Sequence, residues 1–271
     1  MPELPEVETT RRALAGTLTG QRIQALVVRE RRLRQPIPRD LAKRLKGAFI
    51  TGLERRSKYL LLNTDAGAAL MHLGMSGSLR ITEPAATPGP HDHYDLVLAN
   101  GHCLRYRDPR RFGLLLWAGT EPSQHPLLRH IGPEPFDAGF DGDYLYTLSR
   151  GRRVPIKGFL MDGRIVAGVG NIYANEALYR AGIHPHRPAG RIGATRYALL
   201  AREVKAVLRE AIEVGGTTLR DFFYGTGESG YFRIKLAVYD QTGQPCRNCG
   251  TPIRRTVIGQ RASYFCPRCQ R

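Results

Sequence analysis

The four cysteines near the end of the chain constrain its fold more than any other feature of the sequence. Cys246, Cys249, Cys266 and Cys269 have the spacing C-x2-C-x16-C-x2-C. This spacing is typical of a zinc site in which each C-x-x-C turn presents two thiolates to one tetrahedral Zn2+ ion. Four sulfur ligands leave no open coordination position, so the site is expected to be structural. Two disulfides or a redox-active pair are the alternatives, and an acidic N-terminus without the apolar stretch of a secretion signal disfavours both.

The residues between the two cysteine pairs predict a β-hairpin. The stretch PIRRTVIGQRASYF alternates in the manner of paired strands and carries Arg254, Arg255 and Arg261. A basic hairpin held by zinc is suited to reach a DNA groove or backbone. The fifth cysteine, Cys103, lies in a strand-like pattern and is expected to be buried.

The charge of the chain indicates a polyanionic partner. Its 271 residues include 41 Lys and Arg against 24 Asp and Glu, a formal net charge of +17, and the pI is about 10.2. A pI above about 9 is typical of nucleic-acid-binding domains. Codon composition can also enrich arginine, but the acidic residues do not rise with it. No apolar run reaches the roughly 18 residues of a membrane span, so we expect no membrane partner.

Short apolar runs dominate the first part of the chain, residues 1–120, which we expect to form a catalytic β-domain. Residues 3–18 predict a helix with one apolar face. The many short runs after it, separated by turn signals, favour a β-sandwich or a barrel. Examples of these strand-like runs are Ile23–Val28, Ala48–Leu53, Tyr59–Leu62, Tyr94–Leu98, Cys103–Arg107 and Leu114–Trp117.

The rest of the chain divides into three parts by composition and periodicity. Residues 121–150 are rich in Pro, Gly and Asp and indicate a linker. Residues 151–232 are expected to form a helical domain, with the clearest helix over 196–214. The Gly-rich, aromatic segment 217–233 at its end favours a loop. Residues 233–271 complete the chain with the zinc module. The predicted class is therefore α+β with two domains.

The first six residues suggest a chemical site. Removal of Met1 would expose the secondary α-amine of Pro2, and an α-amine has a pKa of about 7.7–8.0 against about 10.4 for lysine. The neutral amine is a nucleophile, and its attack on an aldehyde-level carbon gives a cationic iminium that labilises adjacent C–O bonds. Glu3 and Glu6 share one face of the first helical turn and could donate protons or stabilise charge. The alternative is that they only offset the helix dipole. Retention of Met1 would make Pro2 an amide and block this chemistry.

Several motifs in order along the whole chain resemble formamidopyrimidine-DNA glycosylases. They are PELPEVET at 2–9, SKYLLL at 57–62, HLGMSG at 72–77, DPRRFG at 108–113, GVGNIYANEAL at 168–178 and the four cysteines. The resemblance implies a bifunctional base-excision-repair enzyme, a DNA glycosylase and AP lyase that removes 8-oxoguanine and formamidopyrimidines from duplex DNA. It also implies a two-layer β-sandwich with an N-terminal helix, followed by a helix–two-turn–helix domain with a zinc finger.

The resemblance assigns five residues to catalysis. Pro2 is similar to the family nucleophile on the sugar C1′, Glu3 to its proton donor, and Glu6 to an acid that supports the charged intermediate. Lys58 resembles a hairpin lysine that binds phosphate and donates the proton for β-elimination. Arg261 resembles an arginine that contacts phosphate and is also named as the proton donor for δ-elimination. Since an arginine with a pKa above about 12 is a poor acid, we favour the phosphate contact.

Four further residues are expected to act where the damaged base leaves the helix. Met75, Arg110 and Phe112 resemble the family triad that fills the vacated space, with Arg110 bonded to the opposite cytosine and Arg111 beside a phosphate. Independently of the resemblance, a glycosylase must take its base out of the stack, and apolar wedges can hold the step open. The alternative for Met75 is a place in the core.

The remaining positions implied by the resemblance contact or orient DNA. Asn171 resembles a residue that holds phosphate at a helix N-terminus. His93 and Arg152 resemble residues that touch DNA, although solvated polar side chains are an alternative for both. Lys157 resembles a lysine that touches the damaged base or a phosphate, and Glu176 an acid that orients neighbouring basic groups. The loop 217–231 resembles the element that covers the flipped base.

Two other functions remain open from the sequence. A sister enzyme of the endonuclease VIII type would share Pro2, Glu3, Lys58 and the zinc but prefer oxidised pyrimidines, whereas DPRRFG and Leu4-Pro5 favour the purine enzyme. A non-catalytic zinc-finger DNA-binding protein would form no covalent intermediate. We expect a monomer that binds damaged double-stranded DNA in the cytoplasm of a bacterial-type cell, associated with the nucleoid.

Overall fold

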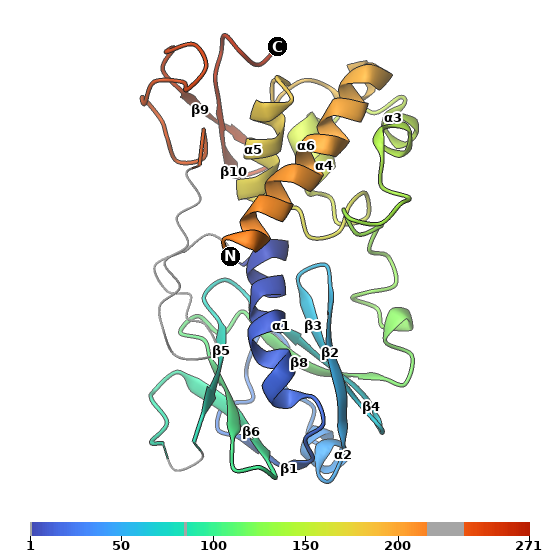
Figure 1. Ribbon diagram of the computed structural model, residues 1–271, viewed down its shortest axis with the longest axis vertical. Coiled ribbons are helices and arrows are strands. Elements are labelled where there is room, and N and C mark those ends of the chain that lie inside the picture. Colours follow the sequence, from blue (N-terminus) through green and yellow to red (C-terminus); the bar gives the residue numbers. More distant parts are fainter. Residues whose placement is uncertain (1, 84–85, 216–235) are drawn as a thin grey trace. The chain divides into compact units, whose positions relative to one another are not determined.

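The computed structural model describes residues 2–83, 86–215 and 236–271. The chain divides into two compact units (Figure 1). Of the described residues, 2–83, 86–129 and 215 belong to the N-terminal unit, and 130–214 and 236–271 belong to the C-terminal unit. Each unit has its own helices and strands and is described by itself. Among the described residues, no helix is both long and apolar enough to cross a membrane.

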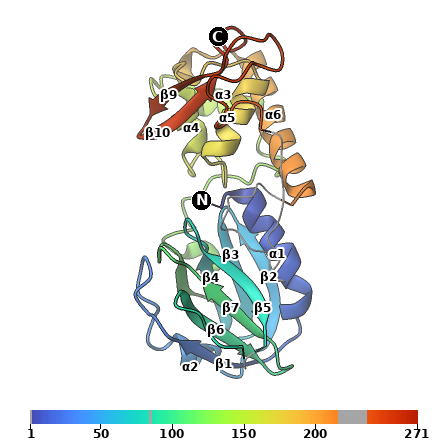
Figure 2. The ribbon, with the colours of Figure 1, turned by 90° about the vertical axis from the view of Figure 1, so that its left-hand side faces the viewer.

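The N-terminal unit opens with helix α1, Leu4–Leu18, within the predicted range. Glu3 is the N-cap residue of a capping box: its carboxylate accepts from the Glu6 backbone N–H, and the Glu6 carboxylate accepts from the Glu3 N–H. Pro5 lies in the first turn, where a missing N–H costs nothing. The helix buries its apolar stripe and packs against strands β2 (Ile50–Arg56), β3 (Tyr59–Thr64) and β5 (Ser78–Thr82) (Figure 2).

Two four-stranded antiparallel sheets form the body of this unit and confirm the predicted β-sandwich. One has the order β1-β6-β7-β5, and the other β2-β3-β4-β8. The remaining strands are β1 Ile23–Val28, β4 Gly67–His72, β6 Asp92–Leu98, β7 Cys103–Arg107 and β8 Leu114–Gly119, and a short helix α2 spans Leu41–Leu45. Strands β4 and β5 were not among the runs named as examples from the sequence, and helix α2 was not predicted.

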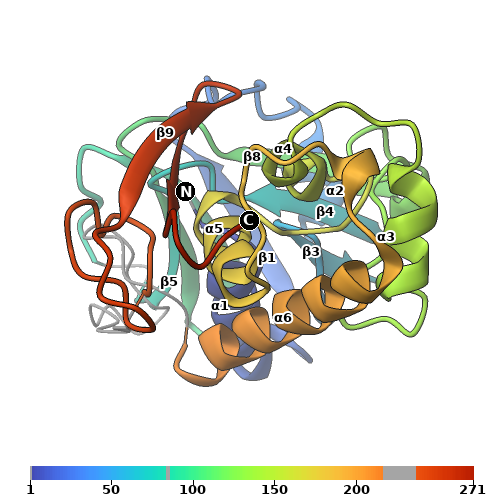
Figure 3. The ribbon, with the colours of Figure 1, turned by 90° about the horizontal axis from the view of Figure 1, so that it is seen from above.

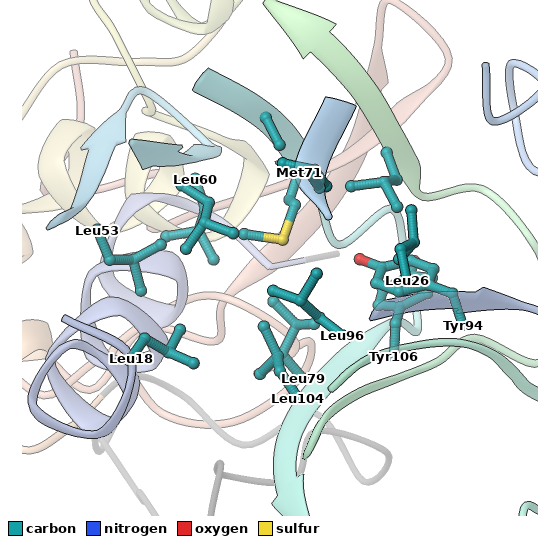
Figure 4. Close-up of a cluster of buried hydrophobic side chains, with 14 of the residues drawn as sticks. Leu18, Leu26, Leu53, Leu60, Met71, Leu79, Tyr94, Leu96, Leu104 and Tyr106 are labelled. Carbon is teal, nitrogen blue, oxygen red and sulfur yellow. The ribbon is translucent and has the colours of Figure 1, made fainter. Parts of the chain in front are cut away.

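The hydrophobic core of the N-terminal unit lies between the two sheets and α1 (Figure 4). Each buried leucine there contributes about 1.5–3 kcal/mol relative to exposure. Cys103 is buried as expected. The residues labelled in the figure are Leu18 from α1, Leu53, Leu60 and Met71 from one sheet, and Leu26, Leu79, Tyr94, Leu96, Leu104 and Tyr106 from the other.

The C-terminal unit is a helical bundle that carries a hairpin. Its helices are α3 Gly142–Ser149, α4 Ile156–Met161, α5 Asn171–Arg180 and α6 Ala194–Glu213, and its strands are β9 Arg254–Ile258 and β10 Arg261–Phe265. Short 3-10 turns span Pro122–Gln124 in the N-terminal unit and Ala189–Arg191 in this one. The hairpin packs beside α5 through β10 (Figure 3).

Helix α3 corrects the predicted linker over residues 121–150. It begins at the N-cap Asp141, whose carboxylate accepts from the Tyr144 N–H, and it packs against α6. A side chain at Gly142 would meet the backbone of Ala198 at 2.4–2.6 Å, so glycine allows this close approach. The Gly- and Asp-rich composition that suggested a linker therefore belongs in part to a helix start and a helix–helix contact.

Candidate active site and nucleic-acid interface

The N-terminus of α1 brings the first three predicted catalytic residues together. Pro2, Glu3 and Glu6 are all buried. The Glu3 N–H donates to Oε2 of Glu6 over 2.8 Å. The Glu6 carboxylate thus completes the capping box of α1, one helical turn from Pro2.

Lys58 lies at the tip of the tight turn between β2 and β3. Arg56 pairs with Tyr59, so Ser57 and Lys58 alone form the loop. Ser57 has a φ of 56°, in the left-handed region, and Arg55 donates from Nη1 to its carbonyl oxygen over 3.0 Å. The lysine is therefore presented by a short loop whose backbone is held by a neighbouring side chain.

The structure brings Met75, Arg110 and Phe112 together at the surface. Met75 is 40% exposed and Phe112 43%, which excludes the core alternative for Met75. The Arg110 guanidinium lies 4.9 Å from the centre of the Phe112 ring. Gly74 permits this arrangement, because it has a φ of +69° and a Cβ there would lie 2.5 Å from the Phe112 carbonyl carbon. Two backbone loops in contact thus carry the exposed apolar tips.

A buried carboxylate that sequence reasoning missed fixes both of these loops. Asp108 accepts at Oδ1 from the Ser76 hydroxyl over 2.8 Å and from the Arg110 N–H over 3.2 Å. It accepts at Oδ2 from the Tyr106 hydroxyl over 3.0 Å and the Gly113 N–H over 2.9 Å. The only sequence signal was its place at the start of DPRRFG. We call 73–77 and 109–113 the wedge loops.

A cavity of about 340 Å³ opens beside the wedge loops. Its lining residues are Arg34, His72, Gly74, Met75 and Phe112. His72 accepts from the Gly74 N–H at Nδ1 over 2.9 Å. Burial, and then the charges of Arg34 and Lys58, lower the pKa of His72 to about 4. The ring is therefore neutral near pH 7, with its proton on Nε2, and supplies one hydrogen-bond donor beside basic groups.

His93 contacts the loop that follows β7, and Arg111 is part of that loop. His93 is buried, and its Nε2 donates to the Asp108 carbonyl oxygen over 2.6 Å. Arg111 has a φ of 55° and pairs with Glu30 over 3.1 Å. The His93 ring thus braces a wedge loop from inside, which the sequence did not indicate. The half-exposed Arg111 remains at the surface, where a phosphate contact was predicted.

In the C-terminal unit, Asn171 is the first residue of α5, after the N-cap Gly170. Helix N-termini present unpaired N–H groups that favour anions. The side-chain Oδ1 of Asn171 is buried and has no hydrogen-bond partner within the part of the chain that the structure describes. The phosphate contact of Asn171 stays a prediction at this helix N-terminus. Arg152 is exposed and donates to the Leu148 carbonyl oxygen.

Lys157 and Glu176 hold the zinc module to the helices. The Lys157 side chain is 1% exposed, and its ammonium donates to the Ala262 carbonyl oxygen over 2.8 Å and the Ser263 hydroxyl over 2.7 Å. The ammonium therefore points inward rather than toward a DNA surface. The buried Glu176 carboxylate accepts backbone N–H bonds of 2.9 Å rather than orienting basic side chains. Its donors are Ala237, Val238 and Tyr239.

The four cysteines meet at one point, as their spacing predicted. Their sulfur atoms all lie within 4.8 Å of one another, with 3.8 Å between Cys246 and Cys269 and 3.5 Å between Cys249 and Cys266. A tetrahedron with Zn–S bonds of about 2.3 Å has S···S edges of about 3.8 Å. The residues therefore fit one structural Zn2+ ion. Arg261 begins β10 of the attached hairpin and is exposed.

Tyr179 reaches this zinc site from α5. Its hydroxyl lies 3.3 Å from the sulfur of Cys246, and with zinc bound the hydroxyl donates to a thiolate. Such outer hydrogen bonds orient metal ligands, and their loss costs about 10–100-fold in metal affinity.

We therefore expect Tyr179→Phe to release zinc about tenfold faster. The measurement is the rate at which a coloured chelator takes up zinc from the folded protein. Tyr144→Phe is the matched control, because the Tyr144 hydroxyl bonds to the Ile165 carbonyl, away from the cysteines. Equal release rates from the wild type and Tyr179→Phe would contradict this role.

A buried Pro2 beside a carboxylate capping box, an exposed apolar wedge and a basic hairpin joined to a four-cysteine site are the features of a DNA-processing enzyme with a structural zinc finger. Three family models match successive parts of the chain: the N-terminal domain of formamidopyrimidine-DNA glycosylase over residues 1–115, its H2TH domain over 131–223, and the zinc finger found in FPG and IleRS over 243–271. The chain belongs to the formamidopyrimidine-DNA glycosylase family, as the sequence motifs indicated.

Similar proteins span the entire chain. The formamidopyrimidine-DNA glycosylases of Methylococcus capsulatus and Pseudomonas aeruginosa are 59% and 56% identical, with both chains fully covered. The structure of Lactococcus lactis Fpg in complex with abasic-site DNA has a TM-score of 0.92 at 34% identity and full coverage of both chains. The MutM (Fpg) protein of Thermus thermophilus has a TM-score of 0.88 at 38% identity, with 99% of this chain and 98% of that chain covered.

Proposed function

We propose that this chain excises oxidised purines, 8-oxoguanine and formamidopyrimidines, from double-stranded DNA and then cleaves the strand, with Pro2 as nucleophile. The observation that carries the proposal is the start of α1, where Pro2 directly precedes the buried capping box of Glu3 and Glu6. The similarity to Lactococcus lactis Fpg, solved with Fapy-dG DNA and with abasic-site DNA, supports it.

Excision begins when the neutral amine nitrogen of Pro2 attacks C1′ of the damaged nucleotide. The N-glycosidic bond breaks, the base leaves with the bonding electron pair and takes up a proton, and the nitrogen loses its own. The sugar ring then opens as O4′ leaves C1′ and is protonated, with Glu3 as the donor. The product is an iminium between Pro2 and C1′. The negative charge of Glu6 stabilises this cation.

Strand cleavage follows from the iminium, which acts as an electron sink. Loss of a C2′ proton expels the 3′-phosphate, with Lys58 bound to that phosphate and supplying its proton. Loss of a C4′ proton then expels the 5′-phosphate, and water hydrolyses the iminium to free Pro2. Arg261 contacts phosphate in this scheme, because its guanidinium holds its proton too tightly to act as an acid.

DNA binding uses groups from both units in this proposal. Met75 and Phe112 enter the step vacated by the flipped base, while Arg110 bonds to the opposite cytosine. Arg111, Arg152, Asn171 and the zinc hairpin contact phosphates. The loop predicted to cover the flipped base, 217–231, lies outside the described residues. We further propose that the enzyme acts as a monomer in the cytoplasm, at the nucleoid.

Oxidised pyrimidines are the second candidate substrates. One structure of wild-type Lactococcus lactis Fpg contains DNA with an oxidised pyrimidine. This observation favours a substrate range that extends beyond purines, as in the sister enzyme considered from the sequence.

Borohydride trapping tests the proposal. Protein with Met1 removed is incubated with an 8-oxoguanine:cytosine duplex, and borohydride then reduces the iminium to a stable adduct. Mass spectrometry identifies the residue to which the DNA is attached. We expect a covalent adduct at Pro2 that is absent with undamaged DNA. An adduct with thymine-glycol DNA alone would instead support the pyrimidine enzyme. Absence of an adduct with both duplexes would contradict the catalytic proposal.

A further inference from the structure

The turn that carries Lys58 is strained and needs an external support. Two-residue loops between antiparallel strands with a positive φ at the first position favour glycine there. This chain has Ser57, with a φ of 56°. Sparsely populated backbone conformations persist only where the surroundings impose them. The position of the lysine therefore depends on the contacts that hold Ser57.

Arg55 supplies such a contact and is itself anchored to α1. Its Nη1 donates to the Ser57 carbonyl oxygen over 3.0 Å, and its Nε donates to Oε2 of Glu8 over 3.2 Å. The two side chains of the pair are nearly buried. The rigid guanidinium fork makes both bonds at once, which a single ammonium nitrogen cannot do. Arg55 thus links the turn to the helix.

Glu8 is a fixed anion on the helix that begins just after Pro2. Burial alone would raise its pKa, but hydrogen bonds from Arg11 and Arg12 and the charges of Arg11 and Arg55 lower the pKa to about 2. Glu8 therefore stays ionised at every pH at which the enzyme could work. It lies only five residues after the N-cap Glu3, so the helix that orients the amine also anchors the turn.

We propose that Glu8 and Arg55 are positioning residues that fix the Lys58 turn relative to the amine of Pro2. The inference rests on the proposed function for the roles of Pro2 and Lys58, and on the structure for the link between them. Its consequence is specific to one step: without the link the amine still attacks, but the lysine no longer meets the leaving phosphate. The iminium then forms and persists.

Arg55→Gln on a preformed abasic duplex separates these steps. We expect strand cleavage to slow about tenfold, while the fraction of protein trapped by borohydride at Pro2 rises, because the intermediate accumulates. Arg55→Lys should behave like Arg55→Gln, since one nitrogen cannot reach both partners. If Arg55→Gln only damaged the fold, the rate of strand cleavage and the trapped fraction would fall together, and that result would overturn the proposal. An unchanged cleavage rate and an unchanged trapped fraction would also overturn it.

Arg12→Gln is the matched control. Arg12 also donates to Glu8, over 2.8 Å, but its side chain is 58% exposed and lies on the helix rather than on the turn. We expect this variant to keep cleavage and trapping within about twofold of the wild type. A tenfold loss in Arg12→Gln would show that any arginine on Glu8 matters equally and would overturn the specific role of Arg55.

Amide hydrogen exchange tests the positioning independently of catalysis. We expect Arg55→Gln to speed exchange in the β2–β3 turn at least tenfold, with the rest of the sandwich unchanged and with no such effect in Arg12→Gln. If the wild type gave no borohydride-trapped adduct at Pro2, the proposed function would be contradicted. Hydrogen exchange would still show whether Arg55 holds the β2–β3 turn to Glu8. Unchanged exchange in Arg55→Gln would overturn the link itself.

Discussion

A chain with an N-terminal extension ahead of Pro2 is expected to lose base excision by at least about a thousandfold, the scale on which enzymes lose activity without their nucleophile. The extension converts the Pro2 nitrogen into an amide, whose lone pair is delocalised into the carbonyl and cannot attack C1′. The Glu3 and Glu6 carboxylates that follow Pro2 cannot take over its role, because a carboxylate forms no iminium with C1′. Single-turnover excision of 8-oxoguanine from a duplex, together with borohydride trapping, measures the loss.

The matched control uses the same extended chain with a protease site placed directly before Pro2. Cleavage regenerates the free amine without any substitution in the protein, so activity and the trapped adduct should return together. Comparison before and after cleavage also removes differences in folding between preparations. Excision by the uncut chain at the wild-type rate, or a trapped adduct at Lys58, would contradict the assignment of Pro2 as nucleophile.

The elements that the sequence predicted correctly are those specified by neighbouring residues. Helix α1 follows from its capping box and its apolar stripe, and the zinc site follows from the two C-x-x-C turns. Strand β4 was not among the named runs because Gly67–His72 is buried on both faces and shows no alternation. Helix α3 was missed because its glycine serves a close contact with α6 that no local pattern reveals.

The parts of the site that escaped prediction depend on partners distant in sequence. Arg55 meets Glu8 across 47 positions, and Ser76 meets Asp108 across 32. Lys157 was expected to face DNA, but its partners in the zinc hairpin lie more than 100 positions away. From the sequence alone, a charged residue such as Lys157 can equally be a ligand contact or a buried side chain that holds two elements together. Only the fold supplies the partner that decides between them.

Asp108→Asn is expected to slow excision from duplex DNA about a hundredfold, equivalent to about 2.7 kcal/mol. The carboxylate accepts four hydrogen bonds from both wedge loops and Tyr106. An amide nitrogen in its place would face two donors, and each buried group left unsatisfied costs about 1–3 kcal/mol. The wedge loops would separate, and Met75 and Phe112 could no longer hold a base step open together.

A preformed abasic site in single-stranded DNA separates wedge function from general damage, because no base must be displaced there. We expect Asp108→Asn to nick this substrate within about threefold of the wild type, while its excision of 8-oxoguanine from duplexes falls. Asp92→Asn is the matched control: Asp92 is likewise buried, at the start of β6, but its carboxylate bonds to Arg80 and Gly89 and not to the wedge loops. We expect it to lose thermal stability to a similar degree and yet to keep the wild-type ratio of duplex excision to single-strand nicking. An equal loss on both substrates in Asp108→Asn would show that Asp108 maintains the fold as a whole and does not specifically set the wedge.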